Sequence, residues 1–170
     1  DITWSSDTSA QGEASGLGLA PTQTAIDDAM TTWQNVPCST IPLTKVSSGG
    51  DIGVIEFLLF GTGSPFIVAD IQHAGFGTLV DLILPPPIIA ATFTFFFIDP
   101  AQLPAIVPTD IDNNGALDAA FREIYYTANF PWGIDTGFPI DVETVALHEA
   151  GHGLSQHHFG KLIRTEKNGK

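Results

Sequence analysis

The feature that most constrains this chain is a five-residue run near its C-terminal end, His148-Glu149-Ala150-Gly151-His152. Two histidines four residues apart lie on one face of an α-helix, about one turn from each other. Asp141 is a good helix N-cap. An apolar face precedes the motif, formed by Val142, Val145 and Ala146. We therefore expect a helix over residues 141–154 that packs by its apolar face and presents both imidazoles together.

The same run predicts a zinc site. Two imidazoles at this spacing can bind one Zn²⁺, with each nitrogen about 2.0–2.1 Å from the metal. Glu149 is rotated away from the metal ligands, so it can hold a water on the zinc and accept its proton as general base. Zinc lowers the pKa of such a water toward about 7, which permits attack on a peptide carbonyl at neutral pH. The sequence therefore predicts a zinc-dependent endopeptidase.

A catalytic zinc site usually has three protein ligands and a water, so a third ligand is needed. Residues 145–155, with His158 after them, resemble the zinc-binding helix of the metzincin family, and of its matrixin-like branch in particular. The family pattern is His-Glu-x-x-His-x-x-Gly-x-x-His. The resemblance implies that His148, His152 and His158 bind zinc and that Glu149 is the general base.

The chain departs from the family pattern in two ways. Ser155 stands where the family has a glycine, and a serine in the left-handed conformation costs on the order of 1 kcal/mol. A different turn there would make His157 the third ligand, although the motif spacing favours His158. The only methionine is Met30, so the Met-turn of the family's C-terminal subdomain is missing. We expect residues 1–170 to form a single metalloprotease-like domain that lacks this subdomain.

The order of the other segments predicts the fold class. Apolar spacing predicts a helix over residues 21–36. Enrichment in β-branched and aromatic residues predicts strands at residues 1–4, 41–46, 52–60, 66–71, 90–98 and 124–127. We therefore expect an α/β fold in which a mixed sheet is backed by two helices, the second carrying the zinc motif. The resemblance implies an α+β metzincin-like domain with a mostly parallel, twisted sheet.

A second candidate metal site lies at residues 110–118. Side-chain oxygens stand at positions one, three and five, a glycine at six, a backbone carbonyl at seven and a carboxylate at nine, as in the opening of an EF-hand-type loop. The expected calcium ligands are Asp110, Asp112, Asn114, Ala116 and Asp118. Position twelve is Phe121 instead of the usual glutamate, and Glu123 is the candidate replacement. The alternative to a Ca²⁺ site is an Asx-rich turn without metal.

The charge balance restricts the partners. Six basic residues face nineteen acidic ones, for a net charge of −13. Such a chain repels nucleic acid and anionic membranes, so we expect neither as a partner. The most apolar stretch, residues 79–98, contains Asp81 and three consecutive prolines and cannot be a continuous spanning helix. The expected partners are protein or peptide substrates, and the resemblance implies a secreted, extracellular protein.

A second hypothesis starts from the missing Met-turn and the apolar residues 93–98. An apolar strand that is left uncovered at a sheet edge invites self-association. The chain would then be a non-catalytic structural or self-assembling protein derived from a protease fold, still able to bind metal. A third possibility is a zinc- or calcium-binding module without catalysis.

Overall fold

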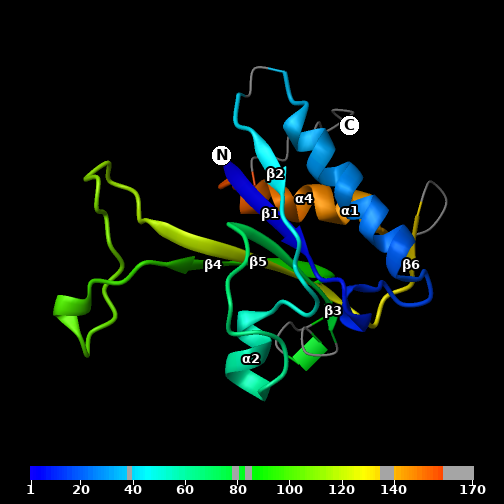
Figure 1. Ribbon diagram of the computed structural model, residues 1–170, viewed down its shortest axis with the longest axis horizontal. Helices are drawn as coiled ribbons and strands as arrows, with labels where there is room; N and C mark the ends of the chain where they lie inside the picture. The colour runs from blue at the N-terminus through cyan, green and yellow to red at the C-terminus, as the bar shows by residue number, and fades with distance from the viewer. Residues whose placement is uncertain (38–39, 78–80, 83–85, 135–139, 159–170) are drawn as a thin grey trace, which may run out of the picture.

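The computed structural model describes residues 1–37, 40–77, 81–82, 86–134 and 140–158. In these residues a five-stranded sheet is combined with three helices (Figure 1). The helices are α1 (Leu19–Gln34), α2 (Val54–Phe60) and α4 (Val142–Gly153), with short 3-10 turns η1 (Ala10–Gly12) and η2 (Pro100–Gln102). The sheet contains β1 (Ile2–Ser6), β2 (Leu43–Lys45), β3 (Ile71–Gly77), β4 (Ala90–Phe96) and β5 (Ala119–Thr127).

The strand order is β2-β1-β3-β5-β4. The pairs β1–β2, β1–β3 and β3–β5 are parallel, whereas β4 runs antiparallel to β5. A separate parallel pair joins β6 (Trp132–Gly133) to β7 (Ile140–Asp141). The prediction of an α/β fold with a mixed, mostly parallel sheet is therefore confirmed. In the described part of the chain β4 is an edge strand, so one side of its backbone pairs with no other described strand.

Helices α1 and α4 lie together on one face of the sheet, and α2 lies on the other (Figure 1). The main core joins Ile26 and Met30 of α1 to Val142 of α4 and to Ile71 and Ile124 of the sheet. Trp33 ties the two helices together, because its Nε1 donates to the carbonyl oxygen of Leu147 at 2.7 Å. The expected helix at 21–36 is thus confirmed, and a third helix covers the face opposite the expected pair.

The strand expected at residues 52–60 is wrong, because residues 54–60 form α2. A short apolar run does not distinguish a buried strand from a buried helix. Here the buried carboxylate of Glu123 decides between them, since it accepts from the backbone N–H groups of Val54 at 2.6 Å and Ile55 at 3.1 Å. These are N-terminal amides that a helix leaves unpaired.

The strand expected at residues 66–71 is also wrong, because β3 begins at Ile71 and continues to Gly77. Its polar side chains are buried but have partners inside the fold. Gln72 donates to Glu123 at 3.0 Å, and His73 Nδ1 lies 2.7 Å from the Tyr126 hydroxyl. Strand β5 starts five residues before the expected 124–127, and β4 ends two residues before the expected 98.

Residues 97–118 connect β4 to β5 and extend away from the body of the sheet, at the left of Figure 1. We refer to this segment as the arm. It carries the expected calcium loop and several exposed apolar side chains, among them Phe97, Leu103, Ile106, Ile111 and Leu117. Among the described residues, no helix has the length and apolar character needed to cross a membrane.

Candidate metal centre

Helix α4 begins where the sequence predicts. Asp141 is the N-cap, and its carboxylate accepts from the backbone N–H of Thr144 at 2.8 Å. Val142 and Ala146 are fully buried, which holds one face of α4 against the core. His148 is exposed and His152 is half-buried, on the side of the helix that faces away from the main core. The expected helix at 141–154 is confirmed.

A sharp turn ends the helix and redirects the chain. Ser155 has φ +65°, the left-handed conformation that usually selects glycine. Its N–H donates to the carbonyl of His152 at 2.9 Å, and the N–H of Gln156 donates to the carbonyl of Gly151 at 2.8 Å. This pair of bonds is a Schellman motif. Arg122 of β5 connects this serine to the sheet, because its Nη2 donates to Ser155 Oγ at 2.7 Å.

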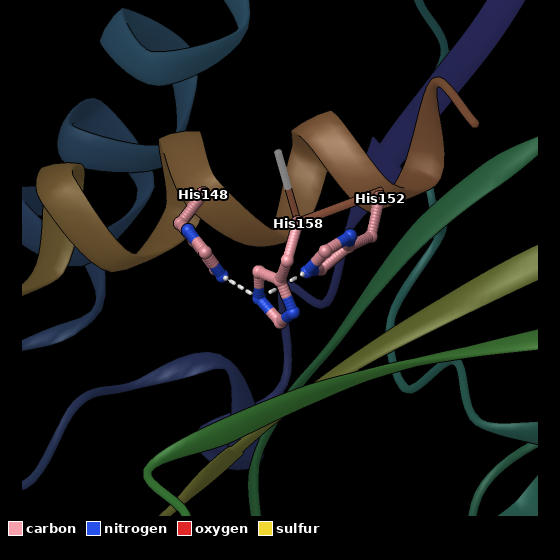
Figure 2. Close-up of side chains that lie close together, drawn as sticks. All are labelled: His148, His152 and His158. Carbon is pink, nitrogen blue, oxygen red and sulfur yellow. Dashed lines mark hydrogen bonds between the residues drawn. The ribbon is translucent and has the colours of Figure 1, made fainter. Parts of the chain in front are cut away.

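After this turn, the side chain of His158 folds back onto the two histidines of the helix (Figure 2). Its Nε2 lies 3.0 Å from Nε2 of His148 and 3.1 Å from Nε2 of His152. In the part of the chain that the structure describes, these three residues are the only group of three histidine, cysteine or acidic side chains that converge this closely. His157, the rival ligand, lines the neighbouring cavities but lies outside this cluster.

The three nitrogens fit a metal ion. Ligands about 2.0–2.1 Å from a tetrahedral zinc are about 3.3 Å apart, close to the separations found here. His152 Nδ1 lies 2.6 Å from the carbonyl oxygen of Gln156. If Nδ1 carries the proton and donates it there, the Nε2 lone pair is free for a metal. His148, His152 and His158 could therefore hold a metal ion.

Glu149 lies next to this cluster but does not join it. Its side chain is buried, with 6% of its surface exposed, and Oε2 accepts from the Thr92 hydroxyl at 2.7 Å. Thr92 belongs to the edge strand β4, so this bond connects the helix to the sheet. The sequence offered no sign of the role of Thr92, because 57 residues separate it from Glu149.

A cavity of about 590 Å³ lies between β4 and α4. Its walls are the first half of β4 with the residues before it, and the face of α4 turned toward β4; among them are Ile89, Ala91, Thr92, Val145, His148 and Glu149. His152 and His158 also border it. The histidine cluster and the Glu149 carboxylate thus face one mostly apolar space beside an edge strand.

The expected calcium residues lie in an exposed loop of the arm. The Asp110 carboxylate accepts from the N–H groups of Asn114 and Gly115, both at 3.0 Å, and Asp118 accepts from Ile111 at 2.6 Å. The loop is thus an Asx-rich turn, and Ca²⁺ binding remains a prediction. Glu123, the candidate replacement at position twelve, does not reach the loop, because its oxygens accept from the N–H groups of Val54 and Ile55 at the start of α2.

Comparison with known proteins leaves the site to be interpreted from its own geometry. No protein-family model matches the chain, and no curated protein matches it in sequence.

Proposed function

We propose that this chain is a zinc-dependent endopeptidase of the metzincin type, close to the matrixin-like branch. The observation that supports it is the convergence of the Nε2 atoms of His148, His152 and His158 beside the carboxylate of Glu149. Three protein ligands leave a fourth position open, as catalytic zinc sites require. Zinc bound there supplies a Lewis acid that activates water and polarises a peptide carbonyl.

The chain's own residues supply the general base and the groups that orient it and one metal ligand. Glu149 is the general base, because its carboxylate is buried at the edge of the cavity and outside the ligand set. The Thr92 hydroxyl fixes one of its oxygens and so holds the carboxylate in orientation. The Gln156 carbonyl orients the His152 ring in the same way.

The substrate in this proposal is an extended peptide that pairs with β4. An edge strand offers unpaired backbone N–H and C=O groups, and peptides bind such edges by strand addition. A peptide along β4 passes over the cavity that Glu149 and the histidines border. The apolar lining of the cavity favours an apolar side chain of the substrate.

The decisive experiment compares zinc content with hydrolysis. Purified protein should contain one zinc per chain by elemental analysis, cleave an unstructured protein such as casein, and lose that activity in chelator. Glu149→Ala should retain zinc and lose hydrolysis. Glu143→Ala, on the same helix but away from the cavity, is the matched control and should cleave normally. Full zinc occupancy without cleavage of any unstructured substrate would refute the proposal.

Exposed apolar side chains favour a second candidate, a structural or self-assembling protein. Ile106 and Ile111 on the arm are 78% and 71% exposed, and Leu58 on α2 is 68% exposed. Large apolar side chains that stay exposed are candidates for burial in an association site. Light scattering over a hundredfold concentration range tests it, since a monodisperse monomer throughout would exclude self-assembly.

We also propose Ca²⁺ binding at residues 110–118 and a secreted, extracellular setting. The loop spacing and the net charge of −13 support cation binding. Terbium luminescence, with Asp112→Ala as the comparison, tests the calcium proposal, and a signal unchanged by the substitution would count against it. Detection of the native protein in the medium outside its cells tests the setting.

A further inference from the structure

Arg122 is a half-buried cation whose charge has no paired carboxylate among the described residues. The only ion pair found there joins Lys45 to Asp27. Arg122 Nη2 donates to the neutral hydroxyl of Ser155, and its buried Nε has no hydrogen-bond partner in the part of the chain that the structure describes. Burial lowers the pKa of the guanidinium and the charge of Asp70 raises it, but an arginine remains charged in either case.

This guanidinium faces a second cavity of about 590 Å³ beside the histidine cluster. The cavity is lined from the sheet, from the end of α4 and from the arm; Thr92, Thr94, Phe96, Arg122, His152 and Ser155 are among its lining residues. His152 and Thr92 border both this cavity and the one that contains Glu149. A ligand extended along β4 therefore passes from one cavity to the other.

The register of the sheet gives the spacing between the two cavities. Thr94 pairs with Arg122, and Thr92, whose hydroxyl binds Glu149, lies two residues back on the same face of β4. Two residues of a strand span about 6.8 Å. An extended peptide whose scissile bond lies near Glu149 thus brings a neighbouring residue, about two positions away, to the level of Arg122.

We propose that Arg122 is a specificity-determining residue that binds a carboxylate of the peptide substrate, one to three residues from the scissile bond toward the Phe96 end of β4. The inference rests on the proposed peptidase function. A guanidinium binds a carboxylate by donating two parallel hydrogen bonds, and such charge-assisted bonds are stronger than neutral ones. The carboxylate belongs either to an acidic side chain or to the free C-terminus of a short substrate.

The first test uses the zinc-loaded protein and pairs of fluorogenic peptides. Each pair carries glutamate or glutamine at one position within three residues of the cleaved bond, and each is made with a free or an amidated C-terminus. We expect the peptide that carries the carboxylate to exceed its neutral partner about tenfold to a hundredfold in kcat/KM, because it makes one charge-assisted contact more. A preference for glutamate over glutamine shows that a side-chain carboxylate binds Arg122. A preference for the free over the amidated C-terminus shows that the terminal carboxylate binds it. Equal rates for all pairs would overturn the proposal.

Variants assign any preference to Arg122. Arg122→Leu should reduce the ratio within the best pair to about one, and Arg122→Lys should give an intermediate ratio because lysine keeps the charge without the planar fork. Lys45→Leu is the matched control. It removes a cation from β2, at the edge of the sheet opposite β4, so the ratio should persist. An unchanged ratio in Arg122→Leu would refute the role of this residue.

A binding measurement separates this proposal from the proposed function. Fluorescence anisotropy of the same peptide pairs with Glu149→Ala protein reports carboxylate recognition without hydrolysis. Suppose that the wild type cleaves no peptide, yet binds the acidic peptide more tightly than its neutral partner, and that this difference depends on Arg122. The peptidase proposal then fails and the carboxylate site stands. If the wild type cleaves peptides with no charge preference in rate or affinity, the carboxylate site fails alone.

Discussion

Replacing Glu56 by glutamine tests the electrostatics beneath α2, on the face of the sheet opposite the histidine cluster. Glu56 is 1% exposed, and no basic side chain pairs with it among the described residues. Burial, together with the charges of Asp51, Asp7 and Glu123, raises its pKa from 4.5 to about 7. We expect Glu56→Gln to stabilise the protein at pH 8 and to have little effect at pH 5.

The sign follows from proton binding. Between pH 4.5 and about pH 7 the native state holds the Glu56 proton more tightly than the unfolded state, so the free energy of unfolding falls as pH rises through this window. The two pKa values, 4.5 and about 7, correspond to a penalty of roughly 3 kcal/mol above pH 7.

Glutamine removes the charge that causes this penalty and keeps the shape of the side chain. It weakens one hydrogen bond, because a neutral amide replaces a carboxylate as the acceptor. With the side-chain amide of Gln11 turned so that its nitrogen faces Glu56, that nitrogen donates to Glu56 Oε2 at 2.8 Å. That loss is about 1 kcal/mol. The net expectation is a gain of about 2 kcal/mol at pH 8 and a change within about 1 kcal/mol at pH 5.

Urea unfolding followed by tryptophan fluorescence provides the assay. Both proteins are measured in chelator, so that protonation of a metal site does not contribute to the pH dependence. Asp28→Asn is the matched control, because Asp28 is an exposed carboxylate on α1, and it should change the unfolding free energy by less than about 0.5 kcal/mol at either pH. An equal effect of Glu56→Gln at both pH values, or a loss of stability at pH 8, would refute the reasoning.

Three further outcomes are expected around the metal centre. Zinc at a thousandfold excess over its Kd should add about 4 kcal/mol of stability, so that chelation lowers the calorimetric Tm by roughly 8–16 °C. His158→Ala should weaken zinc binding by more than about a hundredfold in competition titrations, whereas His157→Ala should leave it within about threefold. Gly151→Ala should lower the free energy of unfolding by about 1–3 kcal/mol in urea, because the added Cβ would lie 2.9 Å from the Trp33 ring.

Local signals predicted the motif helix well. The N-cap at Asp141, the apolar face and the four-residue histidine spacing all act within one or two turns, so the sequence contains the information that forms α4. The same holds for α1, whose buried face repeats at helical spacing. The motif spacing also predicted that His158 lies beside His148 and His152, because only ten residues separate it from His148.

The errors occurred where distant residues decide the local structure. Residues 54–60 are apolar enough for a strand, and Glu123 of β5, 69 residues from Val54, supplies the acceptors that stabilise a helix there. Strand β3 was missed because its buried polar residues resemble a loop until their partners are known. Propensity is a weak guide when a buried partner of this kind is present.

The sequence by itself determined the helix that carries His148, Glu149 and His152, since helical periodicity and capping are local properties of consecutive residues. The motif spacing also favoured His158 over His157 as the third ligand, although Ser155 left the course of the turn open. Only the tertiary structure decided what surrounds that helix. Thr92 reaches Glu149 and Arg122 reaches Ser155 because β4 and β5 pair at one side of the sheet, and strand pairing is set by burial across the whole fold.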